Sequence, residues 1–231
     1  NPLSHVLVSL GSGLIAFILG LMSLDDTRFH RAATPLFIIA AALIPAGFFV
    51  TLDEYFTPTG DIITPSCFVF GSVMTIFAAA FVLTNRTALL FFTLLYYYIF
   101  QIVFMEWADI DAPYPALITG LTGLMVSYGI DKTSHAVISP FFYFWAAIAM
   151  AAASFDILEN TPFDVLLVGV SAGLIYLSTT TGSRTVLTVG VISLLAFLGY
   201  FTDEYFKDIV GWPIALIVFG LLMMGISVFA V

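Results

Sequence analysis

The chain has 231 residues, of which 61% are hydrophobic and only 9% are charged, and its formal net charge is −9 at pH 7. Soluble domains are usually about 45 to 50% apolar and about 25% charged, so this composition excludes an ordinary soluble fold, and the acidic balance argues against a nucleic-acid partner. Long apolar stretches recur along the chain, each near the roughly 20 residues that cross about 30 Å of hydrocarbon. We therefore expect an all-α integral membrane protein whose main partner is the lipid bilayer.

Polar breaks divide the chain into about nine predicted transmembrane helices. In chain order, the predicted spans are Leu3 to Leu24, Thr34 to Leu52, Ile62 to Leu83, Ala88 to Met105, Pro113 to Ile130, Ala136 to Ser154, Pro162 to Thr179, Val186 to Phe201 and Trp212 to Val231. The first span has neither a basic leader nor a small-residue cleavage site, so it is interpreted as a spanning helix rather than a signal peptide.

Charge alternates along the connections between these spans. Five of the six basic residues lie in odd-numbered connections, namely Arg28, Arg31, Arg86, Lys132 and Arg184. By the positive-inside rule, these connections and the C-terminus face the cytoplasm, and the N-terminus faces outward. Twelve of the fifteen acidic residues then fall on the other side, which predicts a strongly acidic outer surface.

The acidic outer turns indicate an internal repeat. Asp53-Glu54-Tyr55-Phe56 recurs as Asp203-Glu204-Tyr205-Phe206, and a proline follows each acidic turn. The intervals are 48, 49 and 51 residues between Pro65, Pro113, Pro162 and Pro213. Such a period is typical of one supersecondary unit repeated in tandem, here a helical hairpin of about 50 residues. We predict hairpins near 35–83, 87–130, 136–180 and 185–231, preceded by an extra first helix at 3–24, all within a single domain of residues 1–231.

The repeated turn has a structural and a functional interpretation. Proline suits the first turn of a helix, and carboxylates just before it complement the positive end of the helix dipole, so the turn needs no ligand to explain it. In the functional interpretation, an outer-face site for a cation or for a basic partner is formed by Asp53, Glu54, Asp203 and Glu204. The structural interpretation is the simpler of the two.

Glycine follows each of these prolines by six or seven residues. Small residues let transmembrane helices approach closely, so we expect each of these glycines to contact a neighbouring helix. Gly169 and Gly173 form a GxxxG pair. The same glycine-rich helix faces predict self-association or association with other membrane subunits.

The end of the chain resembles a known group of membrane proteins. Glu204-Tyr205-Phe206 is followed by Gly211-Trp212-Pro213 and then by an apolar helix that contains Gly220. Over the C-terminal hairpins, this arrangement is similar to uncharacterised bacterial multipass inner-membrane proteins of a domain-of-unknown-function group. The resemblance implies a location in the bacterial inner membrane, and no catalytic residues come with it.

Polar side chains are scarce inside the predicted spans. No ionisable residue lies near the centre of a span, which argues against a proton or ion pathway within one chain. The candidate exception is a kink or pathway at Pro45 and Gly47 of the second span, together with Gln101. Packing is the favoured interpretation of this kink, because no polar side chain accompanies it along the second span.

The titratable and nucleophilic residues form no recognisable catalytic, cofactor-binding or metal-binding motif. The histidines are spread over both predicted faces of the membrane, at His5, His30 and His135. The single cysteine, Cys67, can form no disulfide within the chain. Solvated turns, rather than metal sites, are the favoured interpretation of Asp25, Asp26, His30, Asp131 and His135. We therefore predict a protein that is not an enzyme and has no cofactor.

Two functions are the main candidates, and a third, an intramembrane lipid-modifying enzyme, ranks well behind them. The first is a non-enzymatic inner-membrane protein that serves as a structural or accessory subunit of a larger membrane assembly, which fits the short loops and the spans without buried charge. The alternative is a channel or permease for a neutral or apolar small solute, with a path near Pro45, Gly47 and Gln101. Stoichiometric co-purification with other chains would favour the first function, and a continuous polar cavity would favour the second.

Overall fold

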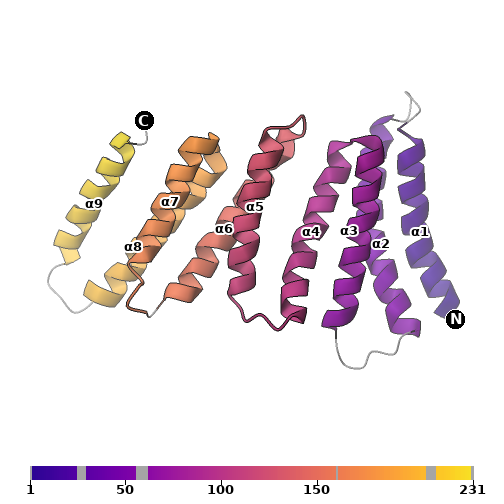
Figure 1. The fold of residues 1–231 in the computed structure, drawn as a ribbon, viewed down its shortest axis with the longest axis horizontal. Coiled ribbons are helices and arrows are strands. Elements are labelled where there is room, and N and C mark those ends of the chain that lie inside the picture. Colours follow the sequence, from indigo (N-terminus) through magenta and orange to yellow (C-terminus); the bar gives the residue numbers. More distant parts are fainter. Residues whose placement is uncertain (1, 25–29, 56–61, 160, 207–211, 230–231) are drawn as a thin grey trace. The chain divides into compact units, whose positions relative to one another are not determined.

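A computed structural model of the chain describes residues 2–24, 30–55, 62–159, 161–206 and 212–229. The structure divides into two compact units, residues 1–111 and 112–231, and each is described here by itself. Every regular element in the described ranges is a helix (Figure 1). The prediction of an all-α protein is therefore confirmed for this part of the chain.

The helices of the first unit are α1 (Pro2–Met22), the short 3₁₀ helix η1 (His30–Ala32), α2 (Ala33–Tyr55), α3 (Ile63–Thr84) and α4 (Thr87–Trp107). Those of the second unit are α5 (Tyr114–Asp131), the 3₁₀ helix η2 (Ala136–Ile138), α6 (Ser139–Leu158), α7 (Leu166–Thr181), α8 (Arg184–Phe206) and α9 (Trp212–Phe229). Among the described residues, six segments are long and apolar enough to cross a membrane, and they lie in α1, α2, α3, α4, α6 and α8. This finding supports a membrane-embedded protein, while the count of nine spans stays a prediction.

Most helices begin and end within a few residues of the predicted spans, because proline and residues with positive φ mark their ends. Proline occupies the first turn of α5 and α6, where its missing N–H costs no helical hydrogen bond. Asn85 ends α3 with φ 53°, and Gly182 ends α7 with φ 67°. Both residue types are common in this left-handed conformation.

The start of α7 differs from the prediction. The expected first residue was Pro162, but α7 begins at Leu166. Residues 161–164 form a separate turn, in which the Asp164 N–H donates to the Thr161 carbonyl over 3.2 Å. Thr161 also donates its hydroxyl to the Leu158 carbonyl of the preceding helix, over 2.7 Å. These bonds hold the chain in a turn, so the helix begins one turn late.

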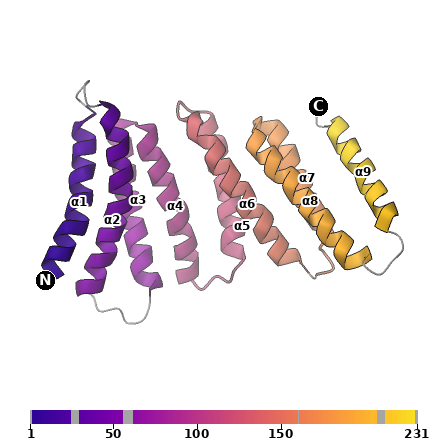
Figure 2. The same ribbon diagram turned by 180° about the vertical axis from the view of Figure 1, so that it is seen from behind.

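Glycine brings α1 and α2 into backbone contact in the first unit (Figures 1 and 2). A Cβ atom added at Gly47 would lie 2.5 Å from the Leu10 Cα, and one added at Gly13 would lie 3.0 Å from the Ile44 nitrogen. Beside this contact, the ring of Phe77 packs against Phe17 of α1, with ring centroids 5.3 Å apart in an edge-to-face arrangement. Edge-to-face pairs of this kind are favourable beyond the area that they bury.

The second unit uses the same device between other helices. A Cβ at Gly120 of α5 would lie 2.6 Å from the Met150 nitrogen of α6, and one at Gly190 of α8 would lie 3.1 Å from the Ile175 nitrogen of α7. The buried core beside these contacts includes Leu124, Tyr143, Leu174, Val186 and Val189. Neighbouring helices therefore approach each other closely at Gly120 and Gly190, as the sequence predicted for Gly120.

The closest helix pairs are α1 with α2, α3 with α4, α5 with α6, and α7 with α8. Each pair is joined by one of the connections that carry basic residues. The predicted hairpins instead join their helices through the acidic turns, so the observed pairs are offset from them by one helix. Contacts between α2 and α3 and between α6 and α7 are also present but less extensive.

We expect Gly120→Leu to destabilise the second unit severely, because the new side chain would collide with backbone rather than with a movable side chain. Overpacking usually costs about 1 to 3 kcal/mol, and a backbone collision lies at or above the upper end of that range. Folded yield by size-exclusion chromatography and the thermal midpoint in mild detergent would measure the effect. The matched control is Gly199→Leu in α8, where a Cβ meets nothing within 4 Å. Equal losses in the two variants would contradict the packing interpretation.

Candidate functional site

The proline site in α2, where a kink was expected, receives a hydrogen bond from another helix. Pro45 lies inside α2, and a proline there leaves the carbonyl four residues earlier, at Ala41, without its helical donor. The hydroxyl of Tyr96 in α4 donates a hydrogen bond to this carbonyl, and the Tyr96 side chain is buried. The polar partner of this kink therefore comes from α4, which is remote in sequence, and not from the second span itself.

Gly47 lies at the contact between α2 and α1. The Leu10 backbone occupies the space that a side chain at Gly47 would take. The Gly47 carbonyl accepts a hydrogen bond of 2.7 Å from the Thr51 hydroxyl of the same helix. Gln101 is partly buried on α4 and lines none of the three grooves described below. Pro45 and Gly47 therefore serve helix packing in this structure, and a pathway through Gln101 stays a prediction.

The acidic residues that the sequence predicts on the outer face are described only in part. Glu54 Oε1 lies 3.2 Å from the Nδ1 atom of His5, which links the end of α2 to the start of α1. Asp53 is exposed in the last turn of α2. The side chains of Asp203 and Glu204 lie outside the described residues. Among the side chains that the structure does describe, no three His, Cys, Asp or Glu residues gather as they would around a metal ion.

The connection between α5 and α6 is held by local hydrogen bonds. The Ser139 hydroxyl at the start of α6 donates to Asp131 Oδ1 over 2.8 Å. His135 is buried, and its backbone N–H donates to the Thr133 hydroxyl over 3.1 Å. Asp131 thus joins the end of α5 to the start of α6. This geometry explains both Asp131 and the His135 backbone as parts of a structured turn.

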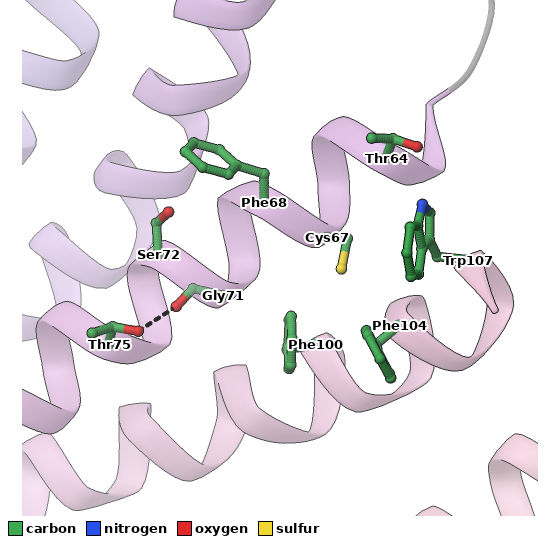
Figure 3. Close-up of a pocket in the computed structure, with 9 residues that line it drawn as sticks. All are labelled: Thr64, Cys67, Phe68, Gly71, Ser72, Thr75, Phe100, Phe104 and Trp107. Atoms are coloured by element: carbon green, nitrogen blue, oxygen red, sulfur yellow. Dashed lines mark hydrogen bonds between the residues drawn. The ribbon is translucent and has the colours of Figure 1, made fainter.

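A groove lies between α3 and α4 in the first unit, with a volume of about 460 Å³. Figure 3 shows Phe100, Phe104 and Trp107 of α4 on one side of it, with Cys67 of α3 facing them. The floor is at Gly71, where a Cβ would lie 3.1 Å from the Phe100 ring. One wall of the groove is therefore aromatic, and the other consists mainly of small residues.

The small-residue wall continues along one face of α3. Cys67, Gly71, Thr75 and Ala79 follow each other at intervals of four residues, which places them on the same side of a helix. Thr75 and Ala79 are exposed. The Thr75 hydroxyl donates to the Gly71 carbonyl over 2.8 Å (Figure 3), so its hydrogen-bonding demand is met within α3. A face of this kind is typical of contacts between transmembrane helices.

Sequence reasoning identified Gly71 but missed the rest of this face, which we name the α3 small-residue face (Cys67, Gly71, Thr75 and Ala79). The signal was available in the spacing of four residues. Small residues other than glycine, such as cysteine, threonine and alanine, can also line a contact between transmembrane helices. The aromatic wall could not be assigned, because only the structure brings Phe100 of α4 beside Gly71.

Two further grooves lie within the second unit. One has a volume of about 700 Å³ and lies along α7, with walls from α5 and α6. The other, of about 500 Å³, lies between α6 and α8 and includes Phe155, Phe197 and Tyr200. Gly169 and Gly173 face the first of these grooves.

The GxxxG pair does not contact a neighbouring helix as expected. A Cβ added at Gly169 or Gly173 would meet nothing within 4 Å in the described structure. The reason is that α7 packs on α8 through another part of its surface, where Ile175 lies against Gly190. The two glycines are therefore left at an open groove.

Similarity to known proteins adds no assignment for these grooves. Comparison of the chain with protein-family models, with curated proteins and with solved structures finds no match. The resemblance of the C-terminal hairpins to bacterial membrane proteins consequently stays a prediction. The α3 small-residue face and the exposed glycines of α7, Gly169 and Gly173, are the features from which a function can be inferred.

We expect Tyr96→Phe to lower the free energy of unfolding by about 1 to 2 kcal/mol, because it leaves the buried Ala41 carbonyl without a donor. In a Pro45→Ala background the backbone N–H of residue 45 becomes available to that carbonyl, so the same change should cost much less. A double-mutant cycle measured by thermal or denaturant unfolding in detergent tests this coupling.

Tyr97→Phe is the matched control for this cycle, because it removes a hydroxyl from the adjacent residue and leaves the Ala41 contact intact. Its cost should be small and should not depend on the residue at position 45. If Tyr96→Phe cost the same in both backgrounds, the hydroxyl would not be serving the proline site.

Proposed function

We propose that the chain is a bacterial inner-membrane protein with nine spans, and that it serves as a structural or accessory subunit of a larger membrane assembly. In this proposal it has no catalytic activity and carries no cofactor. Its partners are the lipid bilayer and at least one other membrane subunit. The observation that carries the proposal is the α3 small-residue face, which lies open beside the aromatic wall of α4.

Helix association in lipid depends on close packing, since lipid tails are as apolar as the side chains that would be buried. The described glycines at Gly13, Gly47, Gly120 and Gly190 serve contacts within the chain. The α3 small-residue face has the same character, but Thr75 and Ala79 remain exposed. A groove of about 460 Å³ adjoins it, so a helix of another subunit has both a small-residue face and a recess to pack against.

The contacts that other helices make at the Pro45 kink of α2 favour this role over the channel or permease alternative. Broken helices in transporters usually line a substrate site. At Pro45, by contrast, the freed carbonyl is bonded to Tyr96, and the adjacent Gly47 is packed against Leu10. A channel or permease would therefore need a path elsewhere, such as one formed between copies of the chain.

The charge distribution supports the proposed orientation, with the basic connections in the cytoplasm and the acidic turns outside. With Cys67 replaced by serine, a cysteine at Asn85 should be protected from a membrane-impermeant maleimide on intact cells. A cysteine at Asp109 should be labelled. Both positions are exposed in the structure, so a difference between them reports membrane sidedness. Labelling of both positions on intact cells would contradict nine spans with this orientation.

The native Cys67 offers a direct test of the partner surface, because it is the only cysteine of the chain and lines the groove. A reagent with a maleimide and a photoreactive group should join Cys67 to a second, different polypeptide in native membranes, which mass spectrometry would identify. The control is Cys67→Ser with Val8→Cys, since Val8 is 71% exposed on α1. That control should give no discrete product.

Ala79→Leu should reduce co-purification of the partner about tenfold, the factor that corresponds to roughly 1.4 kcal/mol. The variant adds bulk to an exposed position of the α3 small-residue face and should leave the fold intact. Ala42→Leu is the matched control at an exposed position on α2. A chain that purifies alone and catalyses saturable solute uptake in liposomes would overturn the accessory role in favour of the permease.

A further inference from the structure

The groove along α7 is open where two of its lining residues, Gly169 and Gly173, are glycines without side chains. Gly169 and Gly173 lie on the α7 side, and Leu121, Leu124 and Met125 of α5 form the opposite wall. The volume of about 700 Å³ lies inside the range of about 300 to 1,000 Å³ that is usual for ligand pockets. The lining is apolar over most of its length, so the groove suits a hydrocarbon chain.

The groove is long enough for one leaflet of a bilayer. The stretch from Gly169 to Thr181 spans about 18 Å at 1.5 Å per residue, and half of the hydrocarbon core is about 15 Å. Thr181 lines the groove at the end of α7, and its hydroxyl donates to the Leu177 carbonyl over 2.9 Å. Because that hydroxyl is bonded to its own helix, the wall remains compatible with an acyl chain.

Positive charge lies at the Thr181 end of the groove. The Lys132 Nζ atom is 4.8 Å from the centroid of the Tyr128 ring, which lines the groove. Arg184 follows Thr181 by three residues and begins α8 after the turn at Gly182. Both basic residues are exposed.

The positive charge at this end is not neutralised by a bound carboxylate. No described carboxylate forms an ion pair with Lys132 or Arg184. Asp131 is the acidic neighbour of Lys132 in sequence, and it accepts a hydrogen bond from Ser139 of α6. Lys132 and Arg184 outnumber this carboxylate, so the segments that follow α5 and α7 together carry a net positive charge.

We propose that the groove along α7 binds one anionic phospholipid, with an acyl chain over Gly169 and Gly173 and the phosphate beside Lys132 and Arg184. An apolar recess with basic residues in the segments beyond its Thr181 end is complementary to a molecule with an apolar tail and an anionic head. A transmembrane helix of a partner would fill the recess but would give no role to the two cations. Charge complementarity thus favours a lipid as the occupant.

Native mass spectrometry of the purified protein, mixed with phosphatidylglycerol or phosphatidylcholine in detergent, tests this site. We expect one tightly retained phosphatidylglycerol, preferred over phosphatidylcholine roughly twenty-five-fold, since each of the two basic side chains contributes about fivefold. The double variant Lys132→Gln and Arg184→Gln should lose most of this preference. Gly173→Leu should lose the retained lipid, because leucine fills the recess.

Two matched controls separate this site from general lipid association. Arg86→Gln removes a positive charge from the first unit and should leave the preference unchanged. Gly199→Leu adds the same bulk to α8 at a position that is also open and should retain the lipid.

The proposal is overturned if the Lys132 and Arg184 double variant keeps the preference, or if Gly173→Leu binds lipid like the parent protein. It is also overturned if Gly199→Leu loses the lipid together with Gly173→Leu. Retention of a co-purified polypeptide whose release depends on Gly173→Leu would assign the groove to a partner helix instead. Failure of the partner crosslink at Cys67 would not affect this result, because that test concerns the other unit.

Discussion

Close contact between helix backbones at glycine is the interaction on which both units depend. In lipid there is little hydrophobic gain from bringing two apolar helices together, so dispersion between well-fitted surfaces has to hold them. The glycines at Gly47 and Gly120 allow this fit, since a Cβ at either position would collide with the backbone of the neighbouring helix. The pairs α1 with α2 and α5 with α6 are organised around these points. Aromatic and aliphatic side chains then fill the space on either side.

The glycines of this protein fall into two groups that the sequence alone does not distinguish. Gly120 and Gly169 each follow a proline by seven residues, and both were expected to contact a neighbour. Gly120 does, whereas Gly169 lies at an open groove. The difference arises from which side of α7 packs on α8, and that choice depends on Ile175 and Gly190 together. A contact between two helices depends on the sequences of both. A glycine pattern in one helix therefore shows that a close approach is possible there, but not that it occurs.

Much of the helical architecture follows from composition and from local signals. Apolar runs, prolines in first turns and the left-handed residues Asn85 and Gly182 fix most helix ends. The start of α7 could not be predicted, because hydroxyl and backbone bonds of Thr161 hold the preceding residues in a turn. The partner of Pro45 was also beyond local reasoning, since 55 residues separate Tyr96 from Ala41. Of the candidate site residues, Gly71 could be found from its position, but the aromatic wall beside it depends on tertiary packing.

The bond between Tyr96 and Ala41 also has a consequence for the order in which the first unit is assembled. Synthesis proceeds from the N-terminus, so α2 and α3 are complete before the residue that serves the Ala41 carbonyl has been made. Until then this carbonyl needs water or another donor, because an unsatisfied backbone group is costly in hydrocarbon. The second helix therefore reaches its final environment only when the fourth is beside it. The first unit is thus completed by α4. This helix supplies the hydrogen bond to the Ala41 carbonyl that α1, α2 and α3 cannot supply.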